Sequence, residues 1–155
     1  MIRNLFLSIM LMTTAMFANS LSLEDNGDGT WNVGYVTDTA IGGFQFNIDD
    51  ASINSASGGD ASANGFMVST SSSTVIGFSL TGGTIPIGDG TLVVLDISGT
   101  PSGISSIVVS NSTGGAIDFS YDPCTGIYDE CGICDGPGIP DGYCDCNSNT
   151  LDCSG

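Results

Sequence analysis

Basic side chains are almost missing from this 155-residue sequence, which contains no histidine and no lysine and whose single arginine is Arg3. Proteins that bind nucleic acids neutralise phosphates with cationic side chains, so nucleic-acid binding is excluded. Attraction to an anionic membrane surface is excluded for the same reason. Catalysis loses its commonest general base, histidine, and the cationic groups that stabilise developing negative charge. We therefore expect a protein that is not an enzyme.

Long apolar runs are also missing, apart from residues 5–17. Arg3 precedes this run, and Ala18 and Ser20 place small side chains where a signal peptidase reads the chain. The run is too short for a comfortable transmembrane helix. We predict that residues 1–20 are a secretory signal peptide, with the bond after Ala18 as an equally plausible cleavage site. The expected location is extracellular or at the cell surface, without membrane insertion after cleavage.

Helical periodicity is absent beyond the signal peptide. Residues 21–121 instead contain short runs in which every second residue is apolar, which is typical of a strand with one buried face. Turn-forming residues separate these runs at roughly 8–12-residue intervals. The spacing predicts an all-β fold, an antiparallel β-sandwich of seven to nine short strands, rather than alternating strands and helices.

The clearest pattern lies in residues 74–98, where two apolar runs predict two core strands. The first run alternates through Ile76, Phe78 and Leu80, and the second through Val93, Leu95 and Ile97. Nearly every aromatic side chain of residues 21–121 is expected to point inward.

A glycine-rich connection, residues 82–90, separates these two runs. Ile85 and Ile87 flank Pro86 in this connection. These two isoleucines either fold back as a strand or form a small exposed binding surface.

Residues 21–36 predict a β-hairpin around the sequence DNGDG, with Trp31, Val33 and Tyr35 on its inward face. The turn partly matches a calcium-binding loop, but the position that needs a bidentate glutamate is occupied by Tyr35. We interpret it as a turn.

Other strands are expected near residues 41–49, 66–68, 107–109 and 117–121. In the first of these, Phe44, Phe46 and Ile48 are expected to share one face. Residues 51–64 are expected to be a long loop or a weak strand around Ile53 with flanking loops.

All six cysteines follow the predicted sandwich, and the boundary is sharp near Asp122 and Pro123. Residues 122–155 form an acidic tail with few apolar residues, so they cannot build a core of their own. An even number of cysteines behind a signal peptide indicates disulfides, for which six cysteines allow 15 pairings. A zinc site made by the two close cysteine pairs is the alternative. The cysteines are Cys124, Cys131, Cys134, Cys144, Cys146 and Cys153.

Carboxylates lie between these cysteines, and hard oxygen ligands in excess favour calcium. The alternative is a solvated acidic surface. The candidate calcium ligands are Asp129, Glu130, Asp135, Asp141 and Asp145.

Three stretches resemble one superfamily: IGGFQFNID, then STVIGFSLTGGTIPIGDGTLVVLDISG, then SSIVVSNSTG. Together they are similar to cohesin-like and carbohydrate-binding-module β-sandwiches. This resemblance implies a jelly-roll-like sandwich over residues 21–121 that docks a dockerin protein or binds polysaccharide. The tail sequence DECGICDG is loosely similar to thrombospondin type 3 repeats, which implies calcium.

Together these features predict a secreted binding module that is part of an extracellular or cell-surface assembly. Its partner is an extracellular protein or a polysaccharide. The alternative is a structural or adhesive surface protein with a calcium-stabilised, disulfide-rich spacer. Carbohydrate modules that bind on a flat surface need exposed, coplanar aromatic rings, and the inward position predicted for Trp31 and Tyr35 favours a protein partner.

Overall fold

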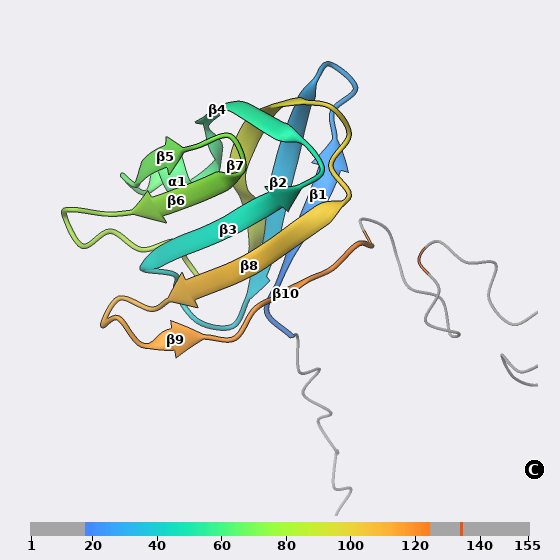
Figure 1. Cartoon of the computed structure of the whole chain (residues 1–155). Helices are drawn as coiled ribbons and strands as arrows, with labels where there is room; N and C mark the ends of the chain where they lie inside the picture. Colours follow the sequence, from blue (N-terminus) through green and yellow to red (C-terminus); the bar gives the residue numbers. More distant parts are fainter. Residues whose placement is uncertain (1–17, 125–133, 135–155) are drawn as a thin grey trace, which may run out of the picture.

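Two five-stranded β-sheets pack face to face in the computed structural model, which describes residues 18–124 and residue 134 (Figure 1). The first sheet has the order β10-β1-β2-β7-β4 and the second β5-β6-β3-β8-β9. The predicted all-β sandwich is confirmed. The strands are β1 (Ser20–Asp25), β2 (Thr30–Thr37), β3 (Gly43–Asp49), β4 (Ser52–Ser57), β5 (Met67–Thr70), β6 (Thr74–Phe78), β7 (Gly88–Ser98), β8 (Gly103–Ser110), β9 (Ala116–Ile117) and β10 (Ser120–Tyr121).

The sheets are antiparallel with one exception, because β1 and β10 run parallel to each other. The predicted last strand, residues 117–121, is divided into β9 and β10, which belong to different sheets. The chain therefore crosses from one sheet to the other along one side of the sandwich (Figure 1).

The predicted hairpin is formed by β1 and β2, joined by a turn. Gly27 and Gly29 have positive φ angles of 77° and 88°. Residues with a side chain rarely adopt such angles, whereas glycine adopts them readily. Asp25 accepts a hydrogen bond from the Gly27 N–H, and Asp28 accepts bonds from both the N–H and the hydroxyl of Thr30. The Thr30 hydrogen bonds lower the pKa of Asp28. DNGDG is thus a turn, as interpreted, and the Gly29 carbonyl also accepts a hydrogen bond from the Ile97 N–H of β7.

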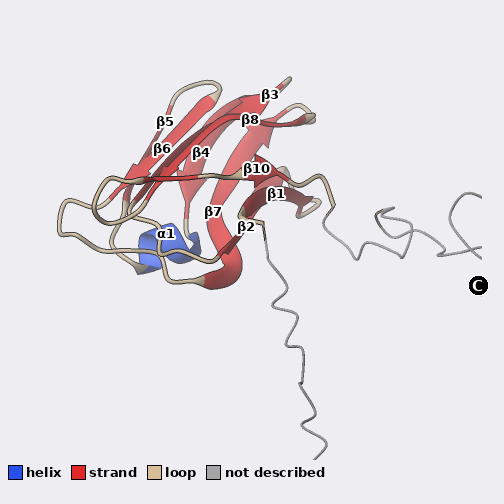
Figure 2. Ribbon diagram, turned by 90° about the horizontal axis from the view of Figure 1, so that it is seen from below, coloured by secondary structure: helices blue, strands red, loops and turns tan. Residues whose placement is uncertain are grey.

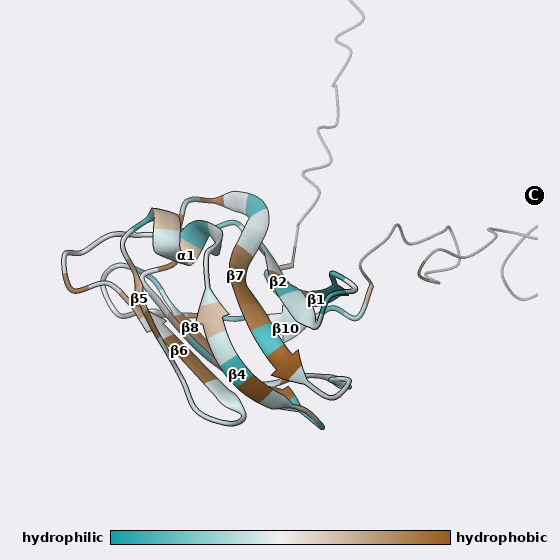
Figure 3. Cartoon of the chain, turned by 90° about the horizontal axis from the view of Figure 1, so that it is seen from above, coloured by the Kyte–Doolittle hydropathy of each residue, from teal (hydrophilic) through white to brown (hydrophobic). Residues whose placement is uncertain are grey.

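The core lies between the two sheets and is built by alternate residues of each strand. Its largest fully buried side chains are Phe46, Leu21, Ile41, Ile85, Leu92, Leu95, Val33, Val75 and Val93. Figure 3 shows hydrophobic residues along β6 and β7, one strand from each sheet. Phe44 stacks on both Phe46 and Phe66, with ring centroids 6.0 Å apart in each pair.

Residues 51–64 contain the weak strand around Ile53, as β4, and a helix that the sequence did not predict. This helix, α1 (Gly59–Ala63), has five residues and buries Ala61. It contacts β7 and β5, which belong to different sheets, and it lies at one end of the sandwich (Figure 2). A helix this short cannot show a 3.6-residue repeat.

The two strands expected in residues 74–98 are present, but they lie in opposite sheets. Their connection crosses the sandwich and is fixed by backbone hydrogen bonds in both directions between Ile41 and Ile85. Within the residues that the structure describes, no helix is long and apolar enough to span a membrane.

Candidate functional site

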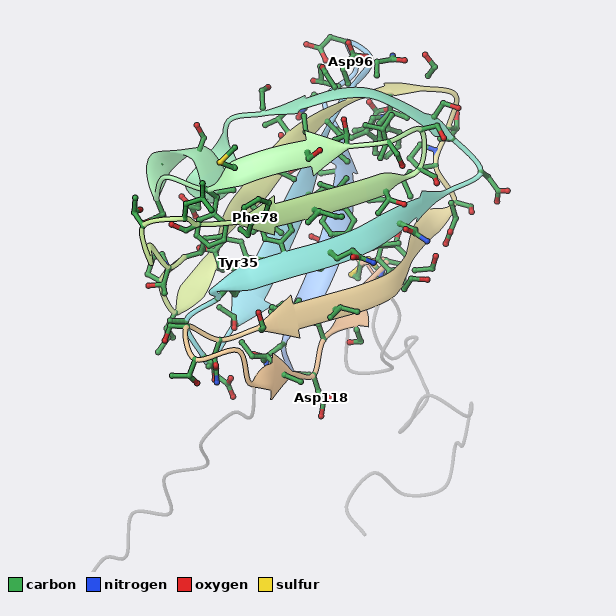
Figure 4. The ribbon with its side chains drawn as sticks, turned by 60° about the vertical axis from the view of Figure 1, so that its left-hand side comes forward. Tyr35, Phe78, Asp96 and Asp118 are labelled. Atoms are coloured by element: carbon green, nitrogen blue, oxygen red, sulfur yellow. A yellow bond between two sulfur atoms is a disulfide. The ribbon has the colours of Figure 1, made fainter. Side chains whose placement is uncertain are left out.

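Four exposed apolar side chains lie on the outer surface of the β5-β6-β3-β8-β9 sheet. They are Met67, Ile76, Phe78 and Val108, with exposed fractions of 54%, 40%, 41% and 60%. We call these four residues the apolar face. Figure 4 looks onto this sheet and labels Phe78 on β6.

The strand register brings these residues into two neighbouring rows. Met67 on β5 lies opposite Phe78 on β6. One row away, Ile76 lies opposite Gln45 of the central strand β3, and Gln45 lies opposite Val108 of β8. Directly opposite residues on one sheet face have Cβ atoms about 5 Å apart, so the rows form one continuous surface.

The outward position of Ile76 and Phe78 corrects the expectation that Phe78 points inward. The inner face of β6 is formed by Val75 and Gly77, both buried. A Cβ at Gly77 would overlap the Phe44 ring. The ring fills the space that an inward side chain of residue 77 would need, so the larger side chains of β6 point outward. Leu80, predicted on the same face, follows the end of β6 and is 76% exposed.

A β-bulge turns Val108 outward. The β3–β8 register shifts between Gln45 and Asn47, and Ser106 of β8 has a φ angle of +50°. One extra residue reverses the alternation along a strand. Ile104 and Val109 are an odd number of positions apart and would point to opposite faces of a regular strand, but the bulge leaves both buried. Val108 therefore points outward and joins the apolar face.

Beyond the apolar face, the same sheet presents hydrogen-bonded polar groups. The Thr74 hydroxyl donates to Asn47 Oδ1 at 2.9 Å, and the Ser105 hydroxyl donates to Asp49 Oδ1 at 2.6 Å. This surface therefore has an apolar part and a polar part.

The outer surface of the other sheet is polar. Asn54 of β4 donates hydrogen bonds to Asp96 Oδ1 at 2.9 Å and to the Ser98 hydroxyl at 3.0 Å. Among the described residues, the large exposed apolar side chains on strands all belong to the β5-β6-β3-β8-β9 sheet. The two outer surfaces thus differ in chemistry.

The binding surface proposed from Ile85 and Ile87 does not form as a pair. Ile85 is fully buried where it bridges Ile41, which excludes it from any exposed surface. Ile87 is 64% exposed and lines a small cleft of about 270 Å³ with Val36. This cleft lies where β2 ends and β7 begins, away from the apolar face.

A buried tyrosine and a carboxylate connect β2 to α1. The Tyr35 hydroxyl donates a 2.8 Å hydrogen bond to Asp60 Oδ2. Burial of the tyrosine, this hydrogen bond and the charges of Asp60 and Asp89 raise the pKa of Tyr35. Tyr35 is 4% exposed, and Trp31 is half-buried against the core, so neither offers a flat aromatic surface to a sugar ring.

The described part of the tail shows one disulfide, between Cys124 and Cys134. Cys124 is buried, and it lines a polar cleft of about 350 Å³ over β1, β2 and β7. The sequence predicted disulfides without choosing among the 15 pairings, and this pair leaves four cysteines with three possible pairings. The other predicted disulfide cysteines lie outside the described residues: Cys131, Cys144, Cys146 and Cys153.

All five candidate calcium ligands lie outside the described residues: Asp129, Glu130, Asp135, Asp141 and Asp145. Within residues 18–124 and 134, no group of three or more carboxylate or cysteine side chains is placed to hold a metal ion. The carboxylates of Asp49 and Asp50 bond to different serines, Ser105 and Ser102.

Sequence reasoning missed the apolar face. Both sides of β6 carry apolar side chains, so alternation alone could not tell which side is buried. No local signal marks the buried side, because Gly77 interrupts the Val75 side and the Phe44 ring that packs against it comes from the neighbouring strand β3.

No protein-family model matches this sequence, and a search of curated proteins finds no match. Several known structures match the fold, among them the following two. A non-cellulosomal cohesin from the archaeon Archaeoglobus fulgidus is 12% identical, with a TM-score of 0.51 over 68% of this chain and 86% of that chain. A type I cohesin–dockerin complex from Clostridium thermocellum matches with 16% identity and a TM-score of 0.51 over 70% of this chain and 92% of that chain. The chain has a cohesin-like β-sandwich fold.

Proposed function

We propose that this chain is a non-catalytic, secreted module that docks another protein on its apolar face. The observation that carries this proposal is the contrast between the two outer sheet surfaces. Contiguous exposed apolar side chains rimmed by polar groups are typical of protein–protein interaction sites. Here the apolar face is continuous with the hydrogen-bonded groups of Asn47 and Asp49 on the same sheet.

A protein partner fits this surface better than a polysaccharide. Phe78 is the one aromatic residue among the large exposed apolar side chains of the described residues. A single ring cannot provide the coplanar aromatic platform on which sugar rings stack. The fold supports the same choice, since one of the matching structures is a cohesin bound to a dockerin.

The partner is expected to be neutral or basic. The described residues 18–124 carry eleven acidic side chains and no lysine, arginine or histidine. A second copy of this chain would bring the same negative charge and be repelled. A standard interface covers about 800 Å² on each partner, which requires the apolar face together with its polar neighbours. The extracellular setting is part of this proposal, whereas the calcium-stabilised spacer belongs to the structural or adhesive alternative.

Binding can be tested with the full chain after signal removal, immobilised with its disulfides intact. The probes are the dockerin of the Clostridium thermocellum complex, extracellular proteins of the source organism, and insoluble cellulose and chitin. The test variant is Phe78→Ser, and the matched control is Ile87→Ser, which removes an exposed apolar side chain away from the apolar face.

We expect that one of the protein probes binds to the unaltered chain and to Ile87→Ser but does not bind to Phe78→Ser. A central aromatic contact contributes about 2 kcal/mol to an interface, so affinity should fall about thirtyfold. Retention that is insensitive to Phe78→Ser would contradict the proposal. Binding to insoluble polysaccharide without a protein partner would replace it with the carbohydrate-binding alternative.

A further inference from the structure

Met67 is the first residue of β5, an edge strand of its sheet, and is 54% exposed. The preceding residue, Phe66, is buried and stacks on Phe44, so the chain holds Phe66 inward and Met67 outward. Met67 lies opposite Phe78, the aromatic residue of the apolar face. A thioether beside an aromatic ring makes a favourable contact.

The sequence makes Met67 chemically distinctive. The other four methionines lie within residues 1–16, so Met67 is the single methionine of the chain that follows the predicted signal peptide. The cysteines that the structure describes are joined as a disulfide. A two-electron oxidant that reaches residues 18–124 therefore meets one exposed thioether, at the edge of the proposed docking surface.

We propose that Met67 is a sulfoxidation site that controls docking on the apolar face. A peroxide is the oxidant. Its O–O bond breaks and one oxygen atom forms an S–O bond with the Met67 sulfur. When the oxidant is hydrogen peroxide, the other oxygen atom leaves as water. The sulfur loses the two electrons that the peroxide gains. Oxidation replaces a flexible apolar side chain with a polar sulfoxide, which methionine sulfoxide reductases reverse.

The fold tolerates this change because Met67 contributes little to the core. Its side chain is more than half exposed, and Phe66 and the β5–β6 pairing hold the strand in place. Oxidation should therefore alter the chemistry of the apolar face without unfolding the sandwich. This regulatory role rests on the proposed docking function, whereas the oxidation itself does not.

The first experiment needs no partner. The full chain after signal removal is treated with hydrogen peroxide, and peptide mass spectrometry locates the added oxygen. Binding of the apolar dye Nile red reports on the apolar face. The dye is neutral, so the acidic protein does not repel it. Met67→Leu is the oxidation-resistant control, and Met67→Gln is a constant mimic of the sulfoxide.

We expect one added oxygen at Met67, a lower Nile red signal in the oxidised chain and in Met67→Gln, and an unchanged melting temperature. Peroxide should leave the dye signal of Met67→Leu unchanged, and the reductases should restore that of the oxidised chain. An oxidised chain that keeps its full dye signal, or that melts at a lower temperature, would overturn the proposal. So would resistance of Met67 to peroxide in the native chain.

The second experiment uses the partner protein, which is the one that binds to the unaltered chain but not to Phe78→Ser. Burying a methionine side chain contributes about 1.5 kcal/mol or more, so oxidation should weaken binding of that protein about tenfold. Unchanged affinity after complete oxidation of Met67 would refute control of docking. If no protein is found whose binding depends on Phe78, the docking function is refuted. The mass and dye measurements still test the chemistry at Met67.

Discussion

Gly77 determines which side of β6 faces solvent, because the Phe44 ring occupies the space beside its Cα atom. Gly77→Ala should destabilise the fold by about 1–3 kcal/mol, the usual cost of overpacking a core. The free energy of unfolding, measured in urea, checks this prediction.

Phe44→Leu provides the matched background for this test, because it replaces the ring with a smaller side chain. In that background Gly77→Ala should cost less than in the unaltered chain, and the difference measures the coupling between the two positions. Equal costs in both backgrounds would mean that the ring does not select glycine.

The Tyr35 hydroxyl contributes stability that depends on pH. Its pKa is raised by burial, by the hydrogen bond to Asp60 and by the nearby charges of Asp60 and Asp89. The folded state therefore favours the protonated tyrosine, and this contribution is complete below the unfolded pKa of about 10 and lost as the pH rises above it.

Tyr35→Phe should lower stability at pH 7 by about 1 kcal/mol, because a hydrogen bond to a partly buried carboxylate is lost. Above pH 10 the gap between the variant and the unaltered chain should narrow, as seen in urea titrations at several pH values. The pKa of Tyr121 is also raised, chiefly by burial, and this tyrosine should contribute equally to the pH dependence of stability in the variant and in the unaltered chain. A gap that widens with pH would contradict this account.

Single residues were the hardest part to predict from the sequence. Alternation correctly identified Phe44, Phe46 and Ile48 as one buried face. It failed for Phe78 because Val75, Ile76 and Phe78 make both sides of β6 apolar. Which side is buried depends on the neighbouring strand, through Phe44, and this contact is not visible in a local pattern.

At the scale of elements, the start of β1 is held by residues that the predicted signal cleavage after residue 20 would remove. Asn19 accepts a hydrogen bond from the Asp38 N–H at 2.8 Å and another from the Ser120 N–H at 3.1 Å. Ser20 pairs with Val36 and Ser120. These contacts favour the alternative cleavage site after Ala18.

A chain that begins at Asn19 should be more stable than one that begins at Leu21 by about 1–2 kcal/mol, since hydrogen bonds and strand pairing are retained. Thermal unfolding of the two chains checks this prediction. Asn19→Ala in the longer chain isolates the side-chain bond to Asp38. Identical melting temperatures would show that Asn19 and Ser20 do not contribute to the fold.

The elements differ in how well the sequence specifies them. The β1–β2 hairpin is local, and its glycine-rich turn identifies it directly. The helix α1 has no such signal, because its five residues gain stability from tertiary contacts with β7 rather than from their own pattern. The bulge at Ser106 is also invisible in the sequence, since serine has no preference for a positive φ angle.

For the whole molecule, negative charge is the dominant electrostatic property. Eleven acidic side chains in residues 18–124 repel one another without any lysine or arginine among them. Salt shortens the Debye length from about 30 Å at 0.01 M to about 8 Å at 0.15 M. We therefore predict that sodium chloride raises the melting temperature over this range.

Calcium chloride at the same ionic strength separates screening from specific binding. A further rise that EDTA reverses would support the calcium ligands proposed for the tail, and a chain ending at Asp122 should lack that rise. Coincident melting curves in the two salts would remove calcium from the account. A melting temperature that falls with salt would contradict the repulsion itself.

The overall architecture was predictable because strand length and turn spacing suffice to indicate a two-layer β fold. Strand neighbours were not. β1 pairs with β10 from the far end of the domain, and β6 and β7, successive in the chain, lie in different sheets. Such arrangements depend on packing between distant residues, about which local alternation carries no information.

The parallel pairing of β1 and β10 determines how this domain responds to tension. A pull between its first and last residues drags the two strands in opposite directions along their shared axis. The bonds from Ser120 N–H to Asn19 O and from Asp122 N–H to Leu21 O lie across that pull and are loaded together in shear. A domain tethered at both ends must therefore break these bonds together before it can extend, whereas an antiparallel pair pulled from adjacent ends opens one bond at a time.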